Sequence, residues 1–341
     1  MTTFATEPAV VVTRGGYVES VHHAAVAVVR SDGTLLYSLG DPTLVTFTRS
    51  SAKPFQALAV VESGALDQYG FTPRELALMC ASHNGQPYHT QTAAHMLGRI
   101  GLTADDLRCG VHMPFHGPTA SAMRQAGEPA TPIHNNCSGK HAGMLALSKY
   151  LGALDHDYRD PAHPVQQMNL ANLADLAEVA PETIQVGVDG CSVPTFGLPL
   201  QAAAHAFARL VDTRSLPSPR AEAAGRIVSA MQTYPEMVGG DDRFDTWLMS
   251  NIPGLISKIG AEGYQGMAVQ RDGEALGIVA RIADGDVANR AQAPLVMEVL
   301  RQLDLLLPRL AGAERWQRGI IRNRHGTEVG DIRPAFELRR V

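Results

Sequence analysis

The feature that most constrains the fold is the presence of strand-like segments at both ends of the chain. Near the start, residues 8–14, 21–30 and 34–40 are rich in β-forming side chains, and a Ser-Asp-Gly turn separates the last two. Near the end, residues 265–269 and 275–282 flank an Arg-Asp-Gly turn. Turns of this kind between β-rich segments are typical of hairpins. Because an isolated hairpin is only marginally stable, we expect the strands from both ends to share one sheet.

Helical periodicity dominates the rest of the chain. The predicted helices are residues 51–66, 73–81, 86–99, 138–151, 163–179, 196–212, 220–233, 243–250 and 289–310. The predicted loops, rich in Gly, Pro, Cys and His, are residues 109–118, 131–140 and 187–195.

This order of elements predicts one α+β domain over residues 1–341. Residues 8–66 and 255–341 would form a sheet lobe, packed against the first and last of the helices. Residues 67–254 would form a mainly helical lobe. A cleft between two such lobes is where a binding site tends to lie.

Composition narrows the possible partners. The 341 residues are 45% hydrophobic and carry a net charge of −5, which gives no electrostatic footprint for nucleic acid or an anionic membrane. No apolar run approaches the roughly 20 residues of a membrane span, and the first residues lack the pattern of an export signal. We therefore expect a cytoplasmic protein. Its four scattered cysteines should be reduced thiols, metal ligands or catalytic groups rather than disulfides.

Lysine is rare in this chain. Of 29 basic residues only Lys53, Lys140, Lys149 and Lys258 are lysines. Arginine keeps its proton in a protein, whereas a desolvated lysine can lose it. A lysine retained against this background therefore indicates a site that uses a neutral amine, except Lys149, which lies in an ordinary exposed helical pattern.

Three short motifs place two of these lysines beside serines. Ser50 and Lys53 are one helical turn apart, so the amine could act as base for the hydroxyl; the alternative is a helix cap with a surface lysine. Ser82 and Asn84 form a Ser-x-Asn motif, and Lys258 begins a Lys-x-Gly motif. The three motifs occur in the order found in serine β-lactamases, although Ser82 comes early and Lys258 late.

A second group of motifs contains thiols. Cys137 and Lys140 lie between two histidines, His134 and His141, and Cys191 follows in a later loop. The thiols could share zinc with a histidine or, unusually, with a neutral Lys140. The alternative is a helix beginning near residue 138 with buried thiols. Other histidines carry less information, and His89 and His95 are expected on a helix surface.

Four motifs together resemble the asparaginase II family, the Rhizobium etli-type or class 3 L-asparaginases. They are Thr48–Gln56, Cys80–Gly85, His134–His141 and Asp189–Pro194. The resemblance covers roughly residues 8–335. It implies a serine β-lactamase/glutaminase-like fold, a homodimer, and an L-asparagine amidohydrolase active in asparagine catabolism.

The resemblance also implies site residues. It pairs Ser50 with Lys53 and Ser82 with Lys258, and it implies zinc held by Cys137, Lys140 and Cys191. A serine would attack the side-chain amide of asparagine, release ammonia and leave an acyl-enzyme for water to hydrolyse. The comparison with β-lactamases nominates Ser50 as the attacking group, and Ser82 with Lys258 as base is its rival. The candidates for holding the substrate are Arg49, Asn84, His141 and Asp189.

Two alternatives stay open from the sequence. One is a glutaminase or another serine amidase of the same fold, since the substrates differ by one methylene group. The other, from a different class, is a non-catalytic zinc-dependent protein that binds an amino acid.

Overall fold

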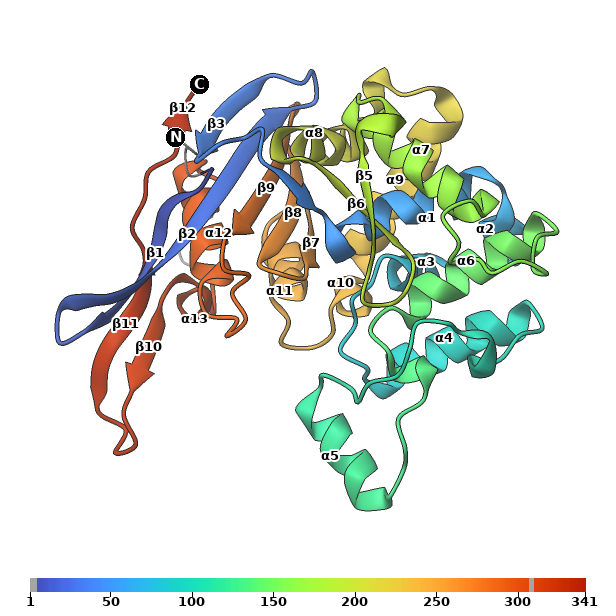
Figure 1. Cartoon of the computed structure of the whole chain (residues 1–341), viewed down its shortest axis with the longest axis horizontal. Coiled ribbons are helices and arrows are strands. Elements are labelled where there is room, and N and C mark those ends of the chain that lie inside the picture. Colours follow the sequence, from blue (N-terminus) through green and yellow to red (C-terminus); the bar gives the residue numbers. More distant parts are fainter. Residues whose placement is uncertain (1–4, 307–309) are drawn as a thin grey trace.

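The computed structural model describes residues 5–306 and 310–341, and strands from both ends of the chain form its main sheet (Figure 1). These strands are β1 (Glu7–Arg14), β2 (Tyr17–Arg30), β3 (Leu35–Leu39), β7 (Leu255–Gly260), β8 (Tyr264–Arg271), β9 (Glu274–Ile282), β10 (Gly319–Arg322), β11 (Glu328–Pro334) and β12 (Arg339–Arg340). The order across the sheet is β10-β11-β1-β2-β9-β8-β7, with β3 on β2 and β12 on β3. The prediction of one sheet shared by both ends is confirmed.

Strand β2 is the longest element of this sheet and joins its two halves. Its first part pairs with β1, where Val11 lies opposite Val21. Its second part lies between β3 and β9, so that Val26 faces Leu39 on one side and Ala280 on the other. All of these pairings are antiparallel. At the end of the sheet nearest the helices, the edge strand β7 carries Lys258 (Figure 1).

Helices cover both faces of the sheet. Helix α8 (Leu200–Val211) packs on one face over glycine; a Cβ at Gly266 would lie 2.2 Å from the ring of Phe207. Helix α12 (Gln292–Gln302) packs on the other face, where the Gln292 amide donates to Gln265. Residues 265 and 266 are neighbours on β8, and successive side chains of a strand point to opposite faces. The sheet is therefore enclosed between α8 and α12.

The helical lobe surrounds helix α1, which carries Lys53. Its helices are α1 (Lys53–Glu62), α2 (Ala65–Gln68), α3 (Pro73–Met79), α4 (Pro87–Arg99), α5 (Gly117–Ala126), α6 (Ser138–Tyr150), α7 (Pro164–Ala177), α9 (Ser218–Thr233), α10 (Pro235–Val238) and α11 (Phe244–Asn251). Helix α1 packs against α6, α7 and α9, and the part of the predicted first helix that contacts the sheet is residues 51–52, which lie in a short 3-10 segment against β7 and β8. Every residue from 53 to 61 is buried, and a helix apolar on all sides needs neighbours all round.

A small second sheet was missed in the sequence. It has the order β4-β6-β5 and consists of β4 (Val45–Phe47), β5 (Gln185–Val188) and β6 (Pro194–Pro199). The first four residues of the predicted helix 196–212 are therefore the end of β6, and α8 begins at Leu200. The strand part contains Thr195 and Phe196, whose side chains favour strands. This sheet brings the loop around Asp189 next to residues 48–50.

Two further predictions are corrected at helix ends and surfaces. The final helix is shorter than residues 289–310: the Asp286 carboxylate accepts backbone N–H groups at 291 and 292, and Asp304 has a left-handed φ of 53°. Residues 307–309 of that prediction lie outside the described residues. His89 is fully buried on α4, where its ring stacks on His83 and its Nε2 lies 2.9 Å from the Glu236 carbonyl.

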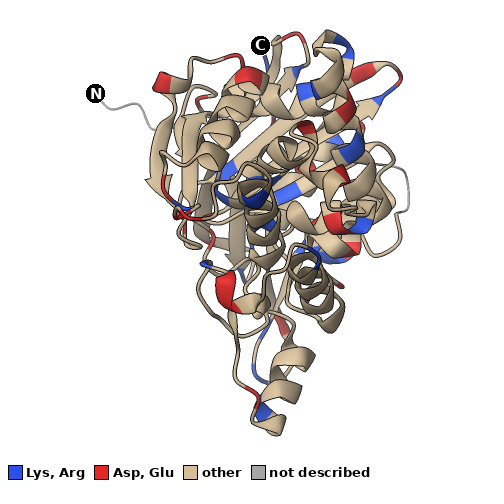
Figure 2. Cartoon of the chain, turned by 90° about the vertical axis from the view of Figure 1, so that its right-hand side faces the viewer, with Lys and Arg blue, Asp and Glu red and all other residues tan. Residues whose placement is uncertain are grey.

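The described helices include none that is long and apolar enough to cross a membrane. On the side shown in Figure 2, basic and acidic positions are interspersed along the helices. No band of one sign dominates this side of the molecule, in agreement with the composition.

Candidate active site

The hydroxyl of Ser82 lies between two buried lysines. The Nζ atoms of Lys53 and Lys258 are each 2.9 Å from Ser82 Oγ. Both lysines are completely buried, and Ser82 is 5% exposed. Lys53 also donates to the Ala81 carbonyl at 2.6 Å, and Lys258 to the Ile259 carbonyl at 2.7 Å. The sequence-predicted pair Ser82–Lys258 is therefore in contact, and Lys53 joins it.

Three elements hold these groups in place. Lys53 is the first residue of α1, directly after a short 3-10 helix, η1 (Arg49–Ala52). Ser82 follows α3 in a loop fixed by its backbone N–H, which donates to the Val238 carbonyl at 3.0 Å. Lys258 lies in β7 opposite Gly266, and its carbonyl accepts a hydrogen bond from the Ser51 hydroxyl of η1. The serine-bearing helix is thus tied directly to the lysine-bearing strand.

The surroundings of Lys258 favour the neutral form of its amine. Burial lowers the pKa of Lys258 to about 7, since desolvation penalises its charged form; Asp245 opposes this, while Lys53 and Arg243 add to it. A neutral Lys258 can accept the Ser82 proton while Ser82 accepts a hydrogen bond from Lys53. One hydroxyl supplies both functions, because it has one proton and two lone pairs.

Ser50 occupies a different environment from Ser82. It is half-buried in η1, and its carbonyl accepts the backbone N–H of Lys53. The described hydrogen bonds of the Lys53 amine go to Ala81 and Ser82 rather than to the Ser50 hydroxyl. The residue before it, Arg49, has a left-handed φ of 50°, which is uncommon for a residue with a side chain.

The predicted zinc ligands lie together in a second buried group. The Lys140 amine is 2.9 Å from Cys191 Sγ, and Lys140, Cys137 and Cys191 are all at least 96% buried. Burial opposes a charge on Lys140, but Cys191, Cys137 and Asp189 together raise its pKa above the ordinary value. A hydrogen bond from Cys191 and the charges of Lys53 and Lys140 hold the pKa of Cys137 well below its usual range.

These three side chains carry donor atoms of the types that zinc binds, and one separation between them can be compared with zinc geometry. With bonds of about 2.0 Å to nitrogen and 2.3 Å to sulfur, ligand atoms around zinc are roughly 3.5 Å apart. The Lys140–Cys191 separation is about half an ångström shorter, so only a small adjustment would admit an ion. Among the described residues, no group of three or more His, Cys, Asp or Glu side chains could hold a metal. A zinc ion here would therefore depend on Lys140.

The proposed substrate-binding residues are only partly brought together. Arg49 Nε is 2.7 Å from Asp189 Oδ1, and Asp189 Oδ2 is 3.5 Å from Cys191 Sγ, so this ion pair borders the thiol group. Nδ1 of the buried His141 is 2.7 Å from the Tyr158 hydroxyl.

Asn84 stands apart from these residues. It holds two loops together, because its backbone N–H donates to the Gly239 carbonyl and its carbonyl accepts from His116. Its side-chain amide donates to the Asp241 carbonyl at 3.4 Å. These contacts indicate that Asn84 holds the loop that carries Ser82 in place.

The sequence did not point to Asp245 or Ser51, both of which contact the strand of Lys258. A signal for Asp245 was present, because it is the one charged residue in the stretch Phe244–Met249, where four of the other five residues are apolar. Buried carboxylates are rare unless they are paired or hydrogen-bonded. Ser51 had no such signal, since a serine near a helix start usually serves as a cap.

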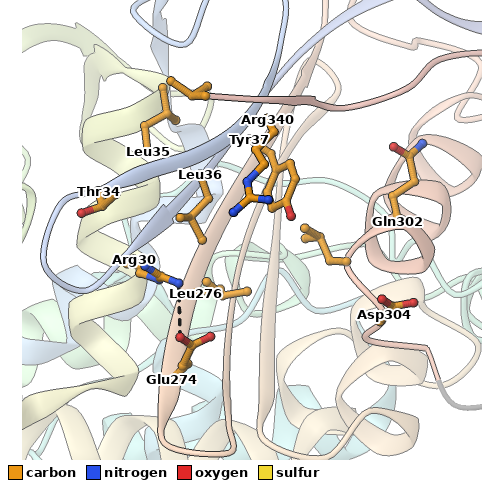
Figure 3. Close-up of a pocket in the computed structure, with 12 residues that line it drawn as sticks. Arg30, Thr34, Leu35, Leu36, Tyr37, Glu274, Leu276, Gln302, Asp304 and Arg340 are labelled. Carbon is orange, nitrogen blue, oxygen red and sulfur yellow. Dashed lines mark hydrogen bonds and ion pairs between the residues drawn. The ribbon is translucent and has the colours of Figure 1, made fainter.

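A cavity elsewhere on the molecule lacks this chemistry. Figure 3 shows a pocket of about 330 Å³ beside β3, β9 and β12. Its Arg30 and Glu274 pair with each other at 3.3 Å, and none of the serines, lysines or thiols described above lines it. The candidate active site is therefore the enclosed Lys-Ser-Lys group, with the thiol group as its neighbour.

Comparison with known families identifies the family of this chain. The family model described as L-asparaginase II matches residues 10–334, nearly the whole chain. The chain belongs to the asparaginase II family. Membership confirms the family predicted from the four motifs.

The solved structures that resemble this family member are more distant. A Bacillus glutaminase has 14% sequence identity and a TM-score of 0.37, over 83% of this chain and 91% of its own. Mglu in its L-glutamate-binding form has 15% identity and a TM-score of 0.39, over 85% of this chain and 61% of its own. A putative β-lactamase from Bacteroides dorei has 12% identity and a TM-score of 0.38, over 76% of this chain and 85% of its own.

These neighbours are of the kinds named in the predicted fold class. The mixed architecture itself, antiparallel sheet packed with helices, is confirmed by the elements described above. At such TM-scores the likeness carries no argument about the chemistry of this chain. No curated protein matches the sequence.

Proposed function

We propose that this asparaginase II family member is an L-asparagine amidohydrolase that works through an acyl-enzyme. Family membership supports a hydrolytic amidase. The observation that carries the finer proposal is the Ser82 hydroxyl held at 2.9 Å by two buried lysines, one of which begins helix α1 three residues after the half-buried Ser50. This arrangement can take a proton from an attacking hydroxyl and return it to a leaving amine.

In the proposed reaction, Ser50 Oγ attacks the side-chain amide carbon of asparagine. Ser50 is the more exposed serine, so it can meet a substrate, whereas Ser82 is engaged with both lysines. The Ser50 proton passes to Ser82 as the Ser82 proton passes to neutral Lys258. The Lys53 ammonium, 2.9 Å from Ser82 Oγ, stabilises the negative charge that develops on this oxygen as its proton moves to Lys258.

The tetrahedral intermediate then collapses. The C–N bond breaks, the amine takes a proton back along the same path and leaves as ammonia, and an aspartyl ester remains on Ser50. Water attacks that ester, with the same lysine as base, and releases L-aspartate and the free serine. The balance is one asparagine and one water to one aspartate and one ammonia.

The attacking serine is tested with the single variants Ser50→Ala and Ser82→Ala. Both are mixed with asparagine, quenched in acid and weighed as intact proteins. We expect the aspartyl adduct on wild type and slowly on Ser82→Ala, and none on Ser50→Ala. An adduct on Ser50→Ala that maps to Ser82 would exchange the roles of the two serines.

The substrate is tested by ammonia release from asparagine and from glutamine at matched concentrations. The pocket has to distinguish the two by one methylene group, which is worth about 1–3 kcal/mol. We expect higher kcat/KM for asparagine. Preference for glutamine would make the chain a glutaminase, and binding of either without ammonia release would make it a binding protein.

We also propose that Cys137, Lys140 and Cys191 hold a zinc ion in the working protein. Their donor types and spacing support this. When bound, zinc would supply a Lewis acid that orients a polar group of the substrate. Arg49 and Asp189 border the same group and would fix the charged ends of the amino acid.

The proposed oligomeric state is a homodimer, on the strength of family resemblance. Light scattering of the purified chain at several concentrations tests it. A mass equal to one chain across that range would overturn the proposal.

A further inference from the structure

Asp245 grips β7 on both sides of Lys258. It is 3% exposed on α11, and one carboxylate oxygen accepts from Ser257 Oγ at 2.8 Å. Its other oxygen accepts from the backbone N–H of Ile259 at 2.8 Å. Because residues 257 and 259 flank Lys258, these two bonds fix the strand immediately before and after the lysine.

This grip comes from the face opposite the site. Alternation along a strand points Ser257 and Ile259 away from the face that carries Lys258. Gln265 of β8 closes the cluster, since its amide donates to Asp245 at 2.7 Å and to Ser257 at 2.8 Å. Gln292 of α12 donates to Gln265 at 3.2 Å. A buried carboxylate with three donors, backed by a second helix, is a rigid support.

Asp245 also supplies charge to the lysine. The charged or titratable groups that act on the Lys258 amine are Lys53 of α1, Arg243 just before α11, the Cys137 thiol and Asp245. The two cations favour loss of the lysine proton, and Asp245 and the thiol oppose it. Asp245 thus holds the strand of the proposed base by hydrogen bonds and acts on its amine by charge.

We infer that Asp245 is a positioning residue of the reaction, which holds Lys258 against Ser82 and tunes the protonation of its amine from behind the strand. The inference rests on the proposed function, in which Lys258 is the base. The residue touches no substrate and acts only through Lys258. Catalysis benefits because a base works best when its pKa lies near the operating pH.

The rarity of lysine makes a direct test feasible. The full chain is labelled with lysine carrying ¹³C at Cε, which gives only four side-chain signals, and Lys258→Arg assigns the one of interest. This signal is followed against pH in wild type and in Asp245→Asn. The matched control is Asp212→Asn, a buried carboxylate that binds Ser31 and Arg214 away from this site.

We expect the Lys258 midpoint to move down by about one pH unit in Asp245→Asn, because a favourable negative charge is removed, and to stay in Asp212→Asn. The acidic limb of kcat/KM should move with it. An unmoved or raised midpoint in Asp245→Asn would overturn the inference. The titration needs no turnover, so an inactive wild type would contradict the proposed function and leave this result standing.

A second variant covers the case in which Asp245→Asn does not fold. Ser257→Ala removes one bond of the grip and keeps the carboxylate charge. We expect kcat to fall about tenfold with KM unchanged and the Lys258 midpoint in place. Unchanged kcat in Ser257→Ala would contradict the positioning role.

Discussion

Two buried lysines of this chain, Lys258 and Lys140, have opposite acid–base character. Both lie almost fully out of solvent in neighbouring groups of the same site. Burial lowers the pKa of Lys258 to about 7, whereas the pKa of Lys140 is raised above its ordinary value. Lys258 contacts the Ser82 hydroxyl, and the two cations near it oppose the raising effect of Asp245 and Cys137 on its pKa. The groups near Lys140, two thiols and a carboxylate, all raise its pKa.

The difference teaches that burial alone does not decide what a lysine does. Desolvation acts in the same direction on both amines, so the sign of the outcome comes from the neighbours. In the Lys-Ser-Lys group formed by Lys53, Ser82 and Lys258, the lowered pKa favours a neutral Lys258 that can accept a proton. The sulfur-centred group consists of Cys137, Lys140 and Cys191. In it, Lys140 donates a hydrogen bond to Cys191 or, once deprotonated, could act as a metal ligand. The two proposed roles of lysine, base and metal ligand, therefore differ through the neighbours of each amine.

The largest effect is expected from replacing the lysines around Ser82 by arginine. Lys258→Arg keeps a positive charge but removes the amine that accepts a proton, and Lys53→Arg replaces the compact ammonium that donates to Ser82 with a bulkier planar group. We expect turnover to fall by about 10²–10⁴-fold with the fold retained, measured by ammonia release and circular dichroism. The matched control is Lys149→Arg, whose amine donates to the Ile100 carbonyl and should keep full activity. Near-normal turnover of either test variant would contradict the mechanism.

The sulfur-centred group should control metal content rather than proton transfer. Cys137→Ala and Cys191→Ala each remove a donor, so zinc bound per chain should fall by about tenfold or more in elemental analysis. Cys109→Ala removes a buried thiol that bonds only backbone carbonyls and should keep its zinc. The same amount of zinc per chain in all three variants would contradict zinc binding by Cys137, Lys140 and Cys191.

The pH dependence separates the two lysines. Lys258 must be neutral to accept a proton, so kcat/KM should fall roughly tenfold per pH unit below a midpoint near 7 and level off above it. Because protonation removes the base, the loss lies on the acid side. Lys149→Arg should show the same midpoint as wild type. A profile that stays flat from pH 8 to 5 would exclude Lys258 as the base.

The smallest effects concern the glycines that make room for each group. A Cβ at Gly266 would press on Phe207 beside Lys258, and one at Gly139 would lie 2.4 Å from the Leu78 carbonyl, between Cys137 and Lys140. Each alanine variant should lose about 1–3 kcal/mol in urea unfolding. Gly98→Ala, in open space on a helix, should lose none. Loss of turnover in Gly266→Ala and of zinc in Gly139→Ala would sharpen the division between the groups.

The sequence predicted both lysines to be site residues, because arginine replaces lysine almost everywhere else in the chain. It also predicted the shared sheet, since β-rich segments at both ends need a common partner. It could not assign the partner of Lys53: an offset of three residues suggested Ser50, whereas the amine contacts Ser82, which is 29 positions away. Spacing along a helix reports local neighbours only.

Other misses have the same origin. The burial of His89 and the packing of α1 among helices depend on what surrounds a helix, and periodicity within one helix does not contain that information. The strand β6 was hidden because its few residues merge with the apolar pattern of α8. Asp245 acts through Ser257 and Gln265, so its importance follows from contacts and not from its place in the chain.

The contact between Ser82 and Lys258 joins residues 176 positions apart. Lys258 reaches Ser82 only through β7, and β7 is held by β8, which pairs with β9 and so with the early strand β2. Long-range antiparallel pairing forms slowly, because a large loop must close before the contacts stabilise it. The helical lobe can therefore fold before the acid–base pair exists. In refolding, enzymatic activity should return after helical signal, and turnover then reports that the sheet from both ends has closed.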